Sequence, residues 1–296
     1  MRKIALSLAI LATTLIPVLC TATELNNRTW VSNIGVDPPG NTQCSVTAPC
    51  LTFAGAISET NTGGEINCLT PGGFGGVNIT KSITIDCYGV LAGVVPNSGA
   101  NGFIINAPGG TVTLRYLVID GIAGGTNGID ITNAAAVTLT DLTIFNFSGK
   151  GIYDQRATAG GMGVINAYIT GNGGAGIVIA GAAGTNAQIT NVVSAGNTYG
   201  VAVASGNGVN VTNSFMEVNS VAGVEADGGA SGVLVDGTSV SGNGTGVAAH
   251  GPVTLNNSTI TGNTTVGISG SMATSFGNNR ILNTNNGTTP TLIGLQ

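Results

Sequence analysis

The chain has 296 residues, of which 49 are glycine, 42% are hydrophobic, 7% are charged and 4% are aromatic. So many apolar residues beside so few charges exclude an intrinsically disordered chain, which is rich in charge and poor in apolar side chains. The formal net charge of −5 gives an acidic surface that repels phosphate backbones, which excludes nucleic acid as a partner.

Residues 1–22 have the pattern of a secretory signal peptide. Arg2 and Lys3 form a basic start, residues 4–19 form an apolar run, and Ala22 is a suitable cleavage point. The apolar run is shorter than the ~20 residues of a membrane-spanning helix, so we expect no membrane span after the signal is removed. The protein should therefore be secreted or periplasmic. Loss of the two basic residues makes the mature chain more acidic.

Residues 23–62 are expected to form an N-terminal cap, because they contain no repeat. Within them "LTFAGAISE" predicts a short helix with Phe53, Ala54 and Ile57 on one face. A solenoid exposes its first coil unless something covers it. We therefore assign this helix to the cap.

Four cysteines remain in the mature chain, at Cys44, Cys50, Cys68 and Cys87. An even number in an exported chain predicts disulfides, whereas a zinc site needs more closely spaced pairs. The segments "EINC" and "TIDC" match in register and should lie on adjacent coils, about 4.8 Å apart, within the range that a disulfide spans. We predict the pairs Cys44–Cys50 and Cys68–Cys87.

Residues 63–275 are predicted to form the coils of a solenoid, with residues 276–296 as a C-terminal cap or tail. A Gly-Asn step, an aliphatic residue three positions before it and a Gly-aliphatic step after it return every 20 to 25 residues. The asparagine of this step lies at Asn172, Asn197, Asn219, Asn243 and Asn263. Short alternating β-branched runs at this period indicate an all-β, single-stranded right-handed parallel β-helix.

The register assigns roles to the repeated positions. One inward ladder should consist of Ile119, Ile144, Ile169, Ser194, Met216, Val240 and Ile260. A second inward ladder should include Ile131, Ile179, Val203 and Ala226. The asparagines are expected to be structural, because Asn tolerates a left-handed backbone at corners and its amide can bond to the next coil. There is room for roughly nine or ten coils at ~4.8 Å each.

The segments "WVS", "APCLTFAGAI" and "GGEINCLTPGGFGGVNITKSITIDC" resemble the start of secreted bacterial right-handed parallel β-helix proteins of the pectate-lyase-like superfamily. The resemblance covers the mature chain and implies the fold. It does not select an activity, because one fold serves lyases, hydrolases, esterases and binding modules. Polygalacturonase-like members carry an Asp-Asp pair and an Arg-x-Lys motif, which this chain lacks.

One polar cluster is expected on neighbouring coils around "KGIYDQRATAGG". It consists of Asp130, Lys150, Tyr153, Asp154 and Arg156. The structural interpretation is an ion-paired loop on a solvated edge. The functional interpretation is a small carbohydrate or calcium site. We favour the structural one, and no cofactor or metal is otherwise indicated.

A second cluster contains the single histidine, His250. Counting from the Gly-aliphatic steps places His250 on the same column as Asp227, one coil later, with Glu225 on the same outward face. These three are the candidate catalytic residues, as a general acid and base. The alternative, which we prefer, is a surface ion pair.

An outward apolar row, with Tyr168, Val193 and Phe215 as its core, is a candidate interaction stripe for self-association. A loop folded over the row is the alternative. Asp120 and Glu217 share another row but lie four coils apart, too far to act together in glycoside hydrolysis.

Two functions remain. The first is an exported non-catalytic β-helix, a cell-surface or envelope scaffold or a carbohydrate-binding module, with a polysaccharide or another envelope protein as partner. The second is a divergent polysaccharide lyase or glycoside hydrolase acting on acidic polysaccharide. The few outward charges and the missing motifs favour the first, so we lean against an enzyme.

Overall fold

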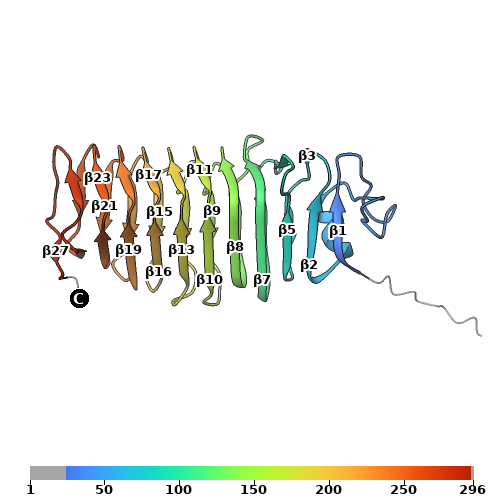
Figure 1. Ribbon diagram of the computed structural model, residues 1–296, viewed down its shortest axis with the longest axis horizontal. Helices are drawn as coiled ribbons and strands as arrows, with labels where there is room; N and C mark the ends of the chain where they lie inside the picture. The colour runs from blue at the N-terminus through green and yellow to red at the C-terminus, as the bar shows by residue number, and fades with distance from the viewer. Residues whose placement is uncertain (1–24, 295–296) are drawn as a thin grey trace, which may run out of the picture.

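The computed structural model describes residues 25–294. It is a right-handed parallel β-solenoid of about nine turns with one helix, which confirms the predicted fold. In Figure 1 the coils stand side by side along the long axis, from blue coils near the N-terminus to red coils near the C-terminus. The predicted signal peptide lies outside the described residues.

Each coil passes through three columns of parallel strands, here called faces 1, 2 and 3. β7 (Phe103–Asp120) and β8 (Ile129–Phe145) run through all three faces without a break. The other strands of face 1 are β4 (Val77–Ile79), β9 (Ile152–Asp154), β12 (Ile177–Ile179), β15 (Tyr199–Val203), β18 (Ala222–Ala226), β21 (Thr245–Ala249) and β24 (Val266–Ser269).

Faces 2 and 3 are built in the same way. Face 2 adds β1 (Asn26–Val31), β2 (Thr60–Cys68), β5 (Ile83–Asp86), β10 (Gly161–Ile165), β13 (Asn186–Thr190), β16 (Gly208–Thr212), β19 (Gly232–Asp236), β22 (Val253–Asn256), β25 (Ala273–Ser275) and β27 (Thr291–Leu292). Face 3 adds β3 (Gly72–Gly73), β6 (Ala92–Val94), β11 (Tyr168–Thr170), β14 (Val193–Ala195), β17 (Phe215–Glu217), β20 (Ser239–Ser241), β23 (Thr259–Thr261) and β26 (Arg280–Leu282).

The interior ladder of face 3 is confirmed residue by residue. Ile119, Ile144 and Ile169 pair in turn, and the ladder continues through Ser194 and Met216 towards Ile260. All of these side chains are buried. Because side chains alternate across a strand, the residues on either side of each ladder position point outward. The register therefore fixes which residues can form a surface site.

The repeated asparagines have the predicted structural role. Asn172, Asn197, Asn219, Asn243 and Asn263 are buried, and each side-chain amide oxygen accepts the backbone N–H of the ladder asparagine one coil earlier or, at the start of the ladder, of Phe147. A separate column takes the left-handed backbone. Its members include Asn166, Asn191, Asn213 and Asn257, with φ between 42° and 58°. The two roles thus belong to two different asparagine columns.

The N-terminal part contains helix α1 (Phe53–Glu59) and both predicted disulfides, Cys44–Cys50 and Cys68–Cys87. The helix buries Phe53 and Ala56, whereas Ala54 is exposed, so the predicted face was wrong at one position. Phe53 packs on two core phenylalanines, and its direction fixes the buried side. β1 already pairs in parallel with β2, so the stack of strands begins before residue 63.

Candidate functional site

Face 1 carries an outward row that runs along the solenoid axis. Strand pairing places one residue per coil in this row, in the order Asn78, Ile104, Asp130, Tyr153, Val178, Ala202, Glu225, Ala248 and Ser269. Both sequence-predicted clusters contribute to it, through Asp130 and Tyr153 at one point and Glu225 at another. The structure therefore joins the two clusters into one surface, called here the face 1 groove.

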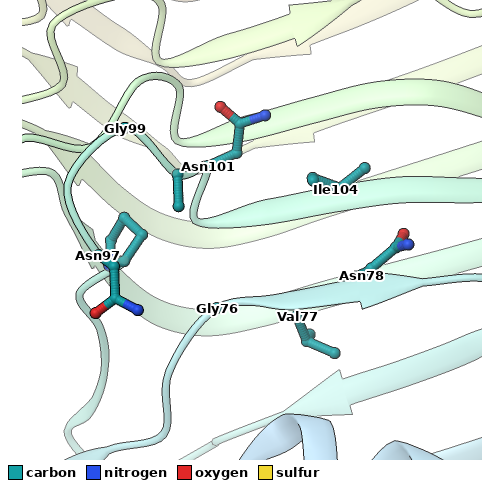
Figure 2. A pocket seen from close by; sticks show the side chains of 9 residues that line it. Gly76, Val77, Asn78, Asn97, Gly99, Asn101 and Ile104 are labelled. Carbon is teal, nitrogen blue, oxygen red and sulfur yellow. The ribbon is translucent and has the colours of Figure 1, made fainter.

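The first hollow of the groove lies at its N-terminal end and has a volume of about 320 Å³. Asn78 and Ile104 form its floor from neighbouring strands, and Asn97 and Asn101 line it from a loop, as Figure 2 shows. Val77, the neighbour of Asn78, is buried. Amide side chains offer both donors and acceptors, so this hollow suits a ligand with hydroxyl groups.

Asp130 lies at the edge of this hollow, only 8% exposed. One of its carboxylate oxygens accepts a hydrogen bond from the Asn101 amide at 3.0 Å, and the other accepts one from Gln155 at 2.7 Å. Asn101 is itself fixed, because its oxygen accepts hydrogen bonds from the backbone and the side chain of Asn127. The loop and the strand are thus held in one geometry by side-chain amides.

The next outward residue, Tyr153, lies beneath a cation. The Lys150 ammonium is 4.1 Å from the centre of the Tyr153 ring, a cation–π arrangement. Both side chains are partly exposed. Lys150 occupies the corner just before the Gly-Ile step that opens β9, which aims its long side chain over the groove. The ammonium adds a positively charged donor above the Tyr153 ring.

Asp154 and Arg156 do not belong to the surface cluster, and their predicted place on a solvated edge is wrong. Asp154 is 0% exposed and Arg156 is 1% exposed. The Arg156 guanidinium donates to both carboxylate oxygens of Asp154, at 2.8 and 2.7 Å, and to two backbone carbonyls. Asp154 pairs with Ile131 and Ile179 in the inward ladder of face 1, which explains its burial.

The second hollow of the groove is smaller, about 160 Å³. Glu225 and Asp227 line it together with Val178, Ala202 and two neighbouring residues. Burial raises the pKa of Glu225 above its ordinary value, an effect that His250 partly offsets and Asp227 reinforces. His250 and Asp227 follow paired residues on adjacent coils, so the predicted register of this corner is confirmed.

Tyr199 belongs to the same part of the surface. Its pKa is raised first by burial and then by the charge of Glu225. Tyr199 thus adds a phenol near the Glu225 carboxylate. Asp130 and Glu225 lie four coils apart, roughly 19 Å at the coil spacing. This separation exceeds the ~5–9.5 Å between the two carboxylates of glycosidases.

Two negative findings concern residues 25–294. No group of three or more His, Cys, Asp or Glu side chains there is placed to hold a metal ion. In the same part of the chain, no helix has the length and apolar character needed to cross a membrane.

Comparison with known proteins decides the family. The profile of the right-handed β-helix region matches residues 127–286, more than half of the chain. The chain belongs to the right-handed β-helix family. No curated protein sequence matches it significantly.

Among solved structures, this right-handed β-helix protein is similar to the pectate lyase Pel9A. The TM-score is 0.57 at 15% sequence identity, and the match covers 92% of this chain and 80% of the lyase. It is also similar to the A-module of the Azotobacter vinelandii mannuronan C-5 epimerase AlgE6, with a TM-score of 0.47 at 16% identity over 78% of this chain and 88% of the module. At such low identity the likeness concerns the fold alone.

Several groove residues of this β-helix protein were not predicted from the sequence, among them Asn78, Asn97 and Gln155. A usable signal existed for others. Asn101, Lys150 and Tyr199 each stand immediately before the glycine that precedes the first inward residue of face 1. This column contributes the loop-side wall of the groove and could have been identified from the repeat alone.

Face 3 carries the predicted stripe. Tyr168, Val193 and Phe215 pair in succession and point outward, and the two rings are each 47% exposed. Within residues 25–294 no segment covers these rings. The row therefore forms an open surface, as one of the two interpretations predicted.

Proposed function

We propose that this protein is an exported, non-catalytic polysaccharide-binding β-helix whose face 1 groove holds an extended glycan along the solenoid axis. One observation carries the proposal. A single outward row begins in the amide-lined hollow at Asn78, passes Asp130 and Tyr153, and ends in the hollow at Glu225. A linear polymer fits a linear row better than a small molecule does.

The chemistry along the row supports this ligand. Amides, a carboxylate and an ammonium group at the N-terminal end can bond to hydroxyl groups on both edges of a sugar ring. Val178 and Ala202 give the second hollow an apolar floor, and a sugar can place its C–H face on such a surface. Pre-arranged side chains of this kind lower the entropy cost of binding.

Export is part of the proposal. The signal-like residues 1–22 and the two disulfides support a secreted or periplasmic location, because disulfides persist in oxidising compartments. We also propose that α1 caps the first coil. The helix contacts β1, β2 and β4, the first strands of the stack. A cap of this kind would keep the exposed strand end from pairing with other chains.

A second candidate function rests on the Glu225 hollow. The Glu225 carboxyl group has a raised pKa and lies beside Asp227, His250 and Tyr199, so it could act as a general acid. The corresponding activity would be a divergent polysaccharide lyase or glycoside hydrolase. The distance of roughly 19 Å from Glu225 to Asp130 argues against a hydrolytic pair across the groove.

A polysaccharide array combined with assays for reducing sugars and unsaturated products tests both functions. We expect binding without turnover, and loss of binding in Asn101→Ala and Tyr153→Ala, because these changes remove a groove wall and its ring. Thr254→Ala, on the outward side of face 2, is the matched control. Turnover that disappears in Glu225→Gln would establish the enzyme instead. Absence of both binding and turnover would leave a structural role.

A further inference from the structure

Two rows of outward residues run along face 3. The first row is Val118, Thr143, Tyr168, Val193 and Phe215, and the second row, two residues later, is Asp120, Phe145, Thr170, Ala195 and Glu217. The third and fifth coils each combine an aromatic ring in the first row with an oxygen-bearing side chain in the second. The second coil reverses this order, and the fourth offers only small apolar groups.

The two aromatic side chains of the first row are separated by a defined distance along the axis. Tyr168 and Phe215 lie two coils apart, roughly 9.6 Å along the axis, and Val118 lies two coils before Tyr168. In an extended β-1,4-linked glycan each ring advances the chain by about one coil step and is turned over relative to its neighbour. Alternate rings therefore present the same apolar face and the same hydroxyl edge. The two-coil separation of Tyr168 and Phe215 matches the two-ring repeat of this polymer.

The start of the row is hollowed. A cavity of about 350 Å³ lies beside Val118 and is lined by Leu91, Tyr116 and Asp141, among others. Tyr116 packs edge-on against Tyr88, with ring centres 5.0 Å apart. Tyr116 has a φ of 59°, a left-handed conformation that a bulky residue rarely adopts. Asp141, Asn166 and Asn191 take the same left-handed corner on the following coils, so this conformation belongs to the repeat, and it places an aromatic ring and a carboxylate beside an apolar hollow.

We propose that face 3 is a second glycan-binding surface, specific for an uncharged, extended β-1,4-linked chain. Tyr168 and Phe215 stack on alternate rings, the hollow beside Tyr116 receives a further ring, and Asp120 and Glu217 accept hydrogen bonds from hydroxyl groups. This surface is separate from the face 1 groove and is proposed to bind its own class of ligand.

The charges of face 3 select the ligand. Asp120, Asp141 and Glu217 lie in or beside the two rows, and neither row contains a basic residue from Val118 to Glu217. A polyuronate would bring its carboxylates against these three. A second copy of the chain would likewise meet carboxylates with carboxylates, which argues against self-association through this stripe. An uncharged glycan has no such conflict.

Calorimetric titration with a β-1,4-linked glucan hexamer tests the proposal. We expect Tyr168→Ala and Phe215→Ala each to weaken binding about tenfold or more, equivalent to about 1.4 kcal/mol. Val193→Ala, on the intervening coil, should change it less than about threefold. Polygalacturonate should not compete. Far-UV circular dichroism and thermal melting check that each variant is folded, which the outward position of these side chains favours.

The groove variant Tyr153→Ala separates this proposal from the proposed function. If Tyr153→Ala abolishes hexamer binding and Tyr168→Ala does not, the groove binds the glycan and the face 3 proposal is wrong. If Val193→Ala weakens binding as much as Phe215→Ala, or no hexamer binds, the alternating platform is also wrong. A dimer in light scattering that Phe215→Asp converts to monomer would show that the stripe serves self-association instead.

Discussion

The coils before residue 148 and those after it are held together by different means. The first region fills its interior with the buried phenylalanines Phe53, Phe74, Phe103 and Phe147 and contains both disulfides. Among residues 148–294 no aromatic side chain is buried, and the coils there are joined by the asparagine ladder from Asn172 to Asn283.

The difference bears on function. Coils filled by large side chains vary in length and leave room for loops, such as the one that carries Asn97 and Asn101 into the first hollow. Coils fixed by a ladder have nearly constant corners, so their outer surfaces are regular. This regularity produces the even spacing of Tyr168, Val193 and Phe215. One region thus supplies shaped hollows, and the other supplies a flat repeating platform.

The buried ion pair lies where the two regions meet and should show the largest effect on stability. Arg156→Leu leaves the Asp154 carboxylate buried without its partner, which we expect to cost about 3–5 kcal/mol. Asp154→Ile combined with Arg156→Leu should recover most of this loss, because both ladder neighbours of Asp154 are isoleucines. Urea unfolding measures both. A double variant as unstable as the single one would contradict this account.

Asp154 also shows which features of the structure could be predicted from the sequence and which were missed. The repeat predicted the coils, the ladders and the disulfides, because the period of two within a strand and the spacing between coils are geometric constants. The same register places Asp154 in line with Ile131 and Ile179, so its burial could have been predicted. Its charge led to a surface assignment instead, because a fully buried carboxylate is rare without a bidentate partner.

Other features of the site could not be predicted in this way. The hollow at Asn78 depends on the path of residues 96–101, which no repeat fixes. The contact of Gln155 with Asp130 depends on a side-chain conformation. The predicted helix was correct in position, and Phe53 and Ile57 pack on the core as predicted, whereas Ala54 is exposed. Loops and rotamers follow tertiary contacts, which a single sequence does not reveal.

The disulfides of the first region should contribute the next largest effect. Replacing Cys68 and Cys87 by serine removes a disulfide that closes a loop of 19 residues. We expect this change to lower the free energy of unfolding by about 3 kcal/mol. The Cys44–Cys50 bridge spans six residues and should contribute less, because it restricts a shorter loop in the unfolded chain. Chemical denaturation of the two double variants compares them. A larger loss from the shorter bridge would show that the native contacts, rather than chain entropy, decide the order.

The ladder of the second region should follow. Asn219→Ala removes the acceptor of the Asn197 backbone N–H and leaves the Asn243 amide oxygen with one donor fewer, at an expected cost of about 2 kcal/mol. Asn210→Ala is the matched control. Its amide donates to Gln188 on the preceding coil in the same manner, but on the outer surface, so about 0.5 kcal/mol or less is expected. Equal losses would mean that burial is not what makes the ladder stabilising.

The smallest effect concerns the two ends of the face 1 groove, one in each region. Asp130, in the loop-rich region, has both carboxylate oxygens hydrogen-bonded to amides. Glu225 lies on the regular surface of the second region and has no hydrogen-bond partner among residues 25–294. Burial without donors raises the pKa of Glu225 above its ordinary 4.5. The folded protein therefore binds this proton more tightly than the unfolded chain does.

The sign of the pH dependence follows from that difference. Below the unfolded pKa both states carry the proton, and the stability that Glu225 gains from it is fully present. As pH rises through the folded pKa, that stability is lost. Glu225→Gln cannot ionise, so its melting temperature should exceed that of the parent by an increasing margin as pH rises from about 4 to about 8, by a few degrees at most for about 0.5 kcal/mol. Asp227→Asn should reduce the margin, because it removes a charge that raises the pKa of Glu225. A margin that shrinks with rising pH would mean that the folded protein stabilises Glu225 as the anion, which would contradict the effect of burial.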